Sequence, residues 1–142
     1  MPVEVEVYQK ELPPAIAEDL RRIYIDTPGY ADAQAVLADL QKRLSERGDR
    51  YYAGRFNGHW ICGALVGDQG EDRVMRYLAV HPATRGRGVA ERLVEEIRQQ
   101  ELERGAGHLV TGFPVDDAAL AAILRAMGFI AHGETGIYRC QL

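Results

Sequence analysis

The chain has 142 residues, of which 46% are hydrophobic and 27% are charged, and its formal net charge is −4. This length and composition predict one globular domain over residues 1–142, built around a single sizeable core. The negative charge argues against nucleic acid as a partner, and no apolar run approaches the length of a membrane span, so we expect no membrane partner either.

The start of the chain and its cysteines narrow the class of protein further. Residues 1–7 (MPVEVEV) have neither the basic region nor the apolar stretch of a signal peptide, so we expect a cytoplasmic protein. Cys62 and Cys140 are too few for a disulfide framework and show no metal-ligand spacing. We therefore expect two free thiols and no metal site.

The first third of the chain predicts a strand followed by two helices. The alternation of apolar and acidic residues over 3–7 has the period of a strand. A helix then begins at Pro13-Pro14 and ends at residues 27–29 (TPG), because proline is tolerated in a first turn and glycine ends a helix. A second helix is expected from about residue 32 to 47, with Gly48 as its stop.

A hairpin is expected next, over residues 50–66. Asn57-Gly58 lies between two apolar runs, and both residues of such a turn adopt positive φ. Side chains alternate between the two faces of a strand, so we expect Tyr51 and Tyr52 to divide between core and surface.

The second half predicts a β–α–β unit. A strand over 73–80, a helix over about 86–104 and a strand over 108–113 follow one another, so the two strands should be parallel with a right-handed connection. Asp116 or Asp117 can cap one more helix, before a closing hairpin over 129–141. The buried stripe of that helix is expected to hold four side chains, Leu120, Ile123, Leu124 and Met127.

The loop between the strand and the helix of this unit, residues 85–90 (RGRGVA), has the features of a phosphate site. Gly86 and Gly88 let the backbone approach a ligand, and the helix directs its unpaired N–H groups back at the loop. Arg85, Arg87 and Arg92 add positive charge. A P-loop is excluded because the chain has no Gly-Lys-Ser/Thr, and the dinucleotide fingerprint is excluded because Glu91 stands in place of the third glycine.

Two motifs in this half resemble those of the GCN5-related N-acetyltransferase (GNAT) superfamily. The pattern R-x-x-G-x-A at residues 85–90, preceded by LAVHP at 78–82, resembles motif A, which binds the pyrophosphate of coenzyme A. The run AILRAMGF at 122–129 resembles motif B. The order β-α-α-β-β-β-α-β-α-β-β also matches, so the resemblance covers the whole chain. It implies the GNAT fold, an α/β (α+β) class with a mixed, mostly antiparallel sheet of six to seven strands and four helices.

The resemblance also implies acetyl-CoA as the cofactor. In that fold the strands carrying Val80 and Leu109 separate, and the pantetheine arm lies between them. The implied pantetheine contacts are Leu78, Ala79 and Val80, and the implied pyrophosphate contacts are Arg85, Gly86, Arg87, Gly88, Val89 and Ala90. The alternatives are a surface loop with solvated arginines, or a flavin or nucleotide bound by the same loop.

The residues for acetyl transfer are less evident. Transfer to an amine needs a base for the ammonium and an acid for the departing thiolate. GNAT enzymes commonly place a tyrosine four residues before the motif B glycine, where this chain has Leu124, and a carboxylate on the strand before the loop, which residues 73–80 lack. Tyr77 and Tyr138 are the candidate catalytic residues, with packing in the core as the alternative role for each.

Two short segments resemble a particular branch of the superfamily. Residues 53–57 (AGRFN) and 84–89 (TRGRGV) are similar to the acetyl-CoA-sensing maturation factors of aspartate decarboxylase, which also lack the motif B tyrosine. Those proteins bind acetyl-CoA and the decarboxylase zymogen and promote its self-cleavage in the pantothenate pathway. Two functions therefore stand: an N-acetyltransferase acting on an amine of a small molecule or protein, and a non-catalytic acetyl-CoA sensor that regulates a protein partner.

Overall fold

Seven strands form one sheet in the order β1-β2-β3-β4-β5-β7-β6 in the computed structural model, which describes residues 2–25, 27, 29–30 and 32–142. Neighbouring strands are antiparallel except β4 and β5, which are parallel. The strands are β1 (Glu4–Gln9), β2 (Arg50–Phe56), β3 (His59–Gln69), β4 (Asp72–Val80), β5 (His108–Thr111), β6 (Ile130–Ala131) and β7 (Tyr138–Gln141). The helices are α1 (Pro14–Ile25), α2 (Ala33–Arg47), α3 (Val89–Glu103) and α4 (Ala118–Ala126), with a short 3-10 helix η1 (Pro82–Thr84). The expected mixed, mostly antiparallel fold is confirmed.

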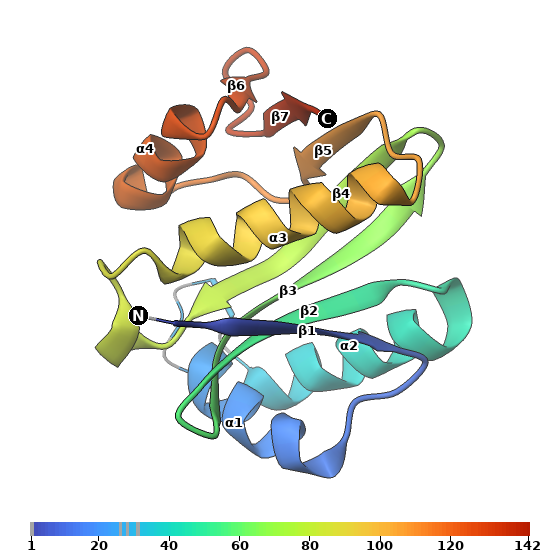
Figure 1. Cartoon of the computed structure of the whole chain (residues 1–142), viewed down its shortest axis with the longest axis vertical. Coiled ribbons are helices and arrows are strands. Elements are labelled where there is room, and N and C mark those ends of the chain that lie inside the picture. Colours follow the sequence, from blue (N-terminus) through green and yellow to red (C-terminus); the bar gives the residue numbers. More distant parts are fainter. Residues whose placement is uncertain (1, 26, 28, 31) are drawn as a thin grey trace.

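Helices α1 and α2 form one side of the molecule (Figure 1). The helical spacing of four apolar residues in α1 places them all in the core, and they are Ile16, Leu20, Ile23 and Tyr24. Gly48 ends α2 in the left-handed conformation at φ 70°, as expected for a C-terminal glycine. Together the two helices cover one face of the sheet with an apolar cluster.

The hairpin of β2 and β3 turns at Asn57 and Gly58, whose φ values of 51° and 77° confirm the expected turn. The expectation that Tyr51 and Tyr52 divide between core and surface is wrong, because both are 0% exposed. They do point to opposite faces, but helices cover both: Tyr51 packs in the cluster beneath α1 and α2, and Tyr52 in the cluster beneath α3.

The parallel pair β4 and β5 positions the site because it separates after a few residues. Pairing runs from Asp72 opposite His108 to Met75 opposite Thr111, and the Gly112 N–H then donates to the Met75 carbonyl at 2.7 Å. Beyond this point β4 and the segment that follows β5 separate. Helix α3 connects them across the front of the sheet (Figure 1) and buries one apolar stripe there, made of Val89, Leu93, Val94 and Ile97.

Helix α4 begins at an N-cap formed by Asp117, whose carboxylate accepts from the Ala119 N–H at 2.8 Å. Its expected buried stripe is only partly correct, because Leu124 is fully buried while Leu120, Ile123 and Met127 remain partly accessible. The hairpin of β6 and β7 then completes the sheet beside β5. Within the described residues, no helix has the length and apolar character needed to cross a membrane.

Candidate coenzyme-binding site

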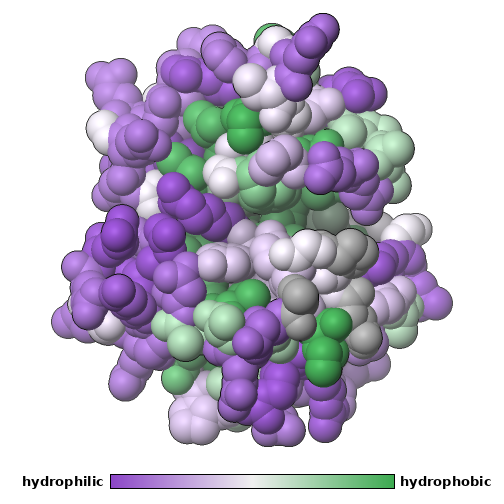
Figure 2. Space-filling view, turned by 180° about the vertical axis from the view of Figure 1, so that it is seen from behind, coloured by the Kyte–Doolittle hydropathy of each residue, from purple (hydrophilic) through white to green (hydrophobic). Residues whose placement is uncertain are grey.

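A cavity of about 510 Å³ opens at the point where β4 and β5 separate. Its walls come from the end of β4, the loop over 84–88, the start of α3, the segment over 113–117, α4 and the connection between α1 and α2. Viewed from behind, hydrophobic side chains gather in a hollow across the middle of the molecule, between hydrophilic rims (Figure 2). This volume lies in the range of cofactor and ligand sites.

The loop at one end of the cavity is shaped by two glycines in the left-handed region. Gly86 has φ 76° and Gly88 has φ 77°, a conformation that other residues adopt only with strain. Gly88 is the N-cap of α3, and no side chain caps this helix. The N–H groups of the first turn of α3 are therefore available to an anion in the cavity, and the helix dipole favours negative charge there.

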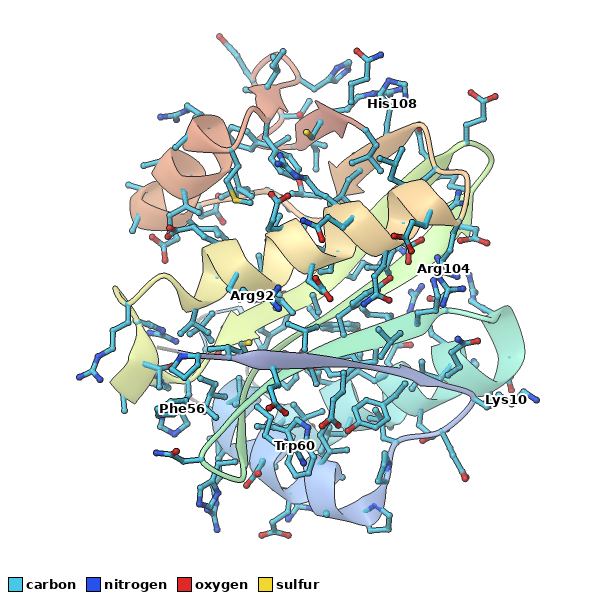
Figure 3. The ribbon with its side chains drawn as sticks, viewed as in Figure 1. Lys10, Phe56, Trp60, Arg92, Arg104 and His108 are labelled. Carbon is cyan, nitrogen blue, oxygen red and sulfur yellow. The ribbon has the colours of Figure 1, made fainter. Side chains whose placement is uncertain are left out.

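The three arginines near the loop have different surroundings. Arg85 lines the cavity, and its Nε donates to the Val80 carbonyl at 3.2 Å, which folds the side chain back along the end of β4. Arg87 is exposed and lies outside the lining. Arg92, near the start of α3 in Figure 3, pairs with Glu96 at 3.2 Å. Of the three arginines, Arg85 is thus the one that lines the cavity, where a guanidinium group can bind a phosphate. The carboxylate of Glu91 also lines the cavity, and its negative charge disfavours a phosphate there.

Most of the residues expected to bind the coenzyme share this cavity. The lining contains eight of the nine, which are Leu78, Ala79, Val80, Arg85, Gly86, Gly88, Val89 and Ala90. The ninth, Arg87, is close in sequence but is exposed and does not line the cavity. The end of β4 and the start of α3 therefore present a strand edge and an anion site to the same space.

The two tyrosines expected to be catalytic lie outside the lining. The Tyr77 hydroxyl donates to Asp39 Oδ2 on α2 at 2.5 Å, and burial, together with this carboxylate, raises the pKa of Tyr77 to about 12. Tyr138 is 5% exposed, and its hydroxyl accepts from Nη2 of Arg125 at 3.0 Å. Both hydroxyls are engaged with neighbouring side chains.

Sequence reasoning missed one tyrosine that does line the cavity. Tyr30 lies in the connection between α1 and α2, and burial raises its pKa to about 12. Its ring packs at 5.5 Å from the rings of both Tyr24 and Tyr77. No motif surrounds Tyr30, so only the fold shows that it meets the cavity. Leu124, at the usual position of the catalytic tyrosine, is 0% exposed and packs in the core.

The sequence is similar to those of known acetyltransferases. A model of the family described as acetyltransferase (GNAT) domain, PanZ, matches residues 5–138. An acetyltransferase of Photorhabdus laumondii is 28% identical over 105 residues, which cover 73% of each chain. One of Pectobacterium atrosepticum is 30% identical over 67 residues, 47% of this chain, and there the chain spans only 48% of the relative's length.

Solved structures show the same fold. A GNAT family acetyltransferase from Elizabethkingia anophelis with acetyl-CoA bound superposes with a TM-score of 0.74 at 12% identity, over 99% of this chain and 98% of that one. Identity this low supports a shared fold alone. The family model, in contrast, spans nearly the whole chain, and this protein therefore belongs to the GNAT acetyltransferases of the PanZ type.

Proposed function

We propose that this protein binds acetyl-CoA in the cavity between β4 and β5. One observation carries the proposal: a single cavity is lined both by Leu78–Val80 at the end of β4 and by the uncapped N-terminus of α3 behind Gly88. A strand edge offers hydrogen bonds to the amides of pantetheine, and the helix start offers N–H groups to the pyrophosphate. The apolar walls suit the aliphatic part of the arm.

We propose acetyl transfer to an amine of a small molecule or protein as the activity of this site. The neutral amine nitrogen attacks the thioester carbonyl and the carbon–sulfur bond breaks; the nitrogen gives up one proton to water, and the departing thiolate takes up a proton from an acid. Tyr30 is the tyrosine in the described lining, so we assign it as the proton donor. Its pKa of about 12 keeps it protonated at neutral pH, but it also makes Tyr30 a weak acid, which predicts slow turnover.

A second function, an acetyl-CoA sensor that binds and regulates a partner protein, is favoured by one specific observation. Leu124 occupies the position of the usual acid and is fully buried, so this helix offers no proton to a thiolate. The family match to the PanZ type agrees with this reading. The partner we propose for it is the aspartate decarboxylase proenzyme of the pantothenate pathway.

Coenzyme binding can be tested by calorimetry with acetyl-CoA. Arg85→Glu should weaken binding by about a hundredfold, because it removes one charge-assisted hydrogen bond and places a negative charge beside the phosphates. Arg87→Glu, in the same loop but outside the lining, should weaken it far less. Arg22→Glu, on the exposed side of α1, is the remote control. Equal affinity in all three variants would remove the phosphate-loop assignment.

The two activities can be separated with the same protein. Release of coenzyme A thiol is measured over a panel of amines, and cleavage of a purified aspartate decarboxylase proenzyme is measured with and without acetyl-CoA. Turnover that Tyr30→Phe lowers at least tenfold, with acetyl-CoA affinity retained, supports the enzyme. Accelerated cleavage of the proenzyme without turnover supports the sensor.

A further inference from the structure

A second cavity, of about 490 Å³, lies against β4 beside the C-terminal end of α2. It is lined by Arg43 and Arg47 of α2, Asp49, the end of β3 and two residues of β4, Val74 and Arg76. None of these residues lines the acetyl-CoA cavity. Both cavities therefore border β4, but they have no lining residue in common.

The carboxylate of Asp49 is buried here without a hydrogen bond. Asp49 is 5% exposed, and its Oδ2 has no hydrogen-bond partner among the described residues. Burial raises the pKa of Asp49, while Arg43 and Arg76 act through charge alone to lower it. A buried carboxylate oxygen without a donor costs free energy comparable to a lost hydrogen bond, so a ligand that supplies a donor would recover it.

Among the described residues, Asp49 lacks a hydrogen-bond donor, whereas Arg76 lacks an acidic partner. Arg43 is held by Asp39 at 2.9 Å, but neither Arg47 nor Arg76 forms an ion pair within the described part of the chain. Burial and the positive charge of Arg43 lower the pKa of Arg76. The cavity thus presents two arginines without acidic partners and one carboxylate without a donor, while its second carboxylate, Asp68, is paired with Arg50 and Arg73.

Two glycines make room for these charged side chains. A β-carbon on Gly67 would lie 2.7 Å from Asp49 Oδ1, and one on Gly112 would lie 2.6 Å from Val74 Cγ1 and 2.9 Å from Arg76 Cγ. Neither glycine has a positive φ, so the backbone conformation does not require glycine at either position. The physical reason that remains is space, for Asp49 at Gly67 and for Val74 and Arg76 at Gly112.

We propose that this cavity binds a small dianion that also carries an ammonium group. Two negative charges match the guanidinium groups of Arg47 and Arg76, which hold carboxylates and phosphates in a fork of N–H donors. The ammonium supplies the donor that Asp49 lacks. An acidic amino acid and a phosphorylated amino alcohol share this chemistry, and the site is separate from the coenzyme cavity on which the proposed function rests.

The test is calorimetry on the full chain with three probes: L-glutamate, phosphoethanolamine, and glutarate, which has the carboxylates of glutamate but no ammonium. L-Glutamate or phosphoethanolamine should bind, and glutarate should bind more weakly. Arg76→Gln should weaken the bound probe by about tenfold or more, because it removes a charge-assisted contact. Asp49→Asn should abolish the preference for glutamate over glutarate. The exposed Arg22→Gln is the control.

Two results would overturn the proposal. One is no binding of either ammonium-bearing probe up to about 10 mM, a concentration that detects even millimolar affinity. The other is equal binding by the native chain and Arg76→Gln. Acetyl-CoA affinity is measured on each variant, and it should stay unchanged in Arg76→Gln, which separates failure of this site from failure of the coenzyme site. Folding of Arg76→Gln is checked by thermal unfolding, because the substitution relieves repulsion from Arg43 but removes a positive charge that compensates the carboxylate of Asp49.

Discussion

Replacing the buried Glu101 of α3 by glutamine should destabilise the fold strongly. Glu101 is 0% exposed and lies at the C-terminal part of α3, which ends near Arg104 in Figure 3. Its Oε2 accepts from Arg50 Nε at 2.8 Å and from the Tyr52 hydroxyl. Its Oε1 accepts from Arg50 Nη2 at 2.7 Å and from Arg73 Nε at 3.1 Å. Four donors from β2 and β4, the strands on either side of β3, thus meet on one carboxylate.

The size of the effect follows from what Glu101→Gln leaves behind. The amide has nearly the same shape, but its NH₂ group is a donor and must face two donors that the carboxylate satisfied. Two arginines that are 5% and 8% exposed, Arg50 and Arg73, also lose their buried counter-charge. Breaking a buried ion pair by removing one partner costs about 3–5 kcal/mol. For a chain of this length that corresponds to a fall in Tm of about 10–17 °C.

The assay is urea unfolding followed by far-UV circular dichroism, with Glu103→Gln as the matched control. Glu103 lies in the same helix and is exposed, so its substitution should change the free energy of unfolding by no more than about 0.5 kcal/mol. A loss below about 1 kcal/mol in Glu101→Gln would refute the reasoning, since it would mean that the network contributes no more than a surface pair. The apparent acetyl-CoA affinity of Glu101→Gln should fall only at temperatures at which a fraction of the molecules is unfolded.

Three further predictions concern particular positions. Gly63→Ala should lower the free energy of unfolding by at least about 1–3 kcal/mol in urea titrations, because its β-carbon would lie 1.8 Å from the Tyr51 hydroxyl oxygen. Leu124→Tyr should not increase thiol release from acetyl-CoA and should lower the Tm, because the side chain points into the core rather than the cavity. Asp49→Asn should raise stability at pH 7. Burial raises the pKa of Asp49, so the ionised carboxylate destabilises the fold. In unfolding measurements the gain should shrink as the pH falls through the raised pKa and be absent below the ordinary pKa of an aspartate.

Local patterns predicted the elements of this fold because each pattern is contiguous in the sequence. The Asn57-Gly58 turn, the Gly48 helix end and the apolar spacing of α1 depend on neighbouring residues only. Burial of Tyr52 depends instead on α3, about forty residues further on, which covers the second face of the sheet. Alternation assigns a side chain to a face, but it does not show whether that face is covered.

The same distinction separates the parts of the site. The end of β4 and the start of α3 are joined by one short loop, so their shared cavity could be inferred from residues 78–90. Tyr30 comes from the connection between α1 and α2, and Ile123 comes from α4. No local pattern marks either residue as a neighbour of that loop. They meet it only because the separation of β4 and β5 leaves a space that both segments border.

A bulge in β4 explains how one strand serves two cavities of opposite character. Val74 and Arg76 line the polar cavity beside α2, so regular alternation would turn Tyr77 toward α3. The register with β3 shifts between Gly63 and Leu65, Tyr77 has φ 55°, and its side chain packs instead with the cluster of α1 and α2. Leu78 then faces the α3 side. The one-residue phase shift places an apolar side chain, rather than the Tyr77 hydroxyl, at the coenzyme cavity, and it leaves the Tyr77 carbonyl to accept from the Tyr24 hydroxyl at 2.5 Å. This geometry is why we assign proton donation to Tyr30 and not to Tyr77.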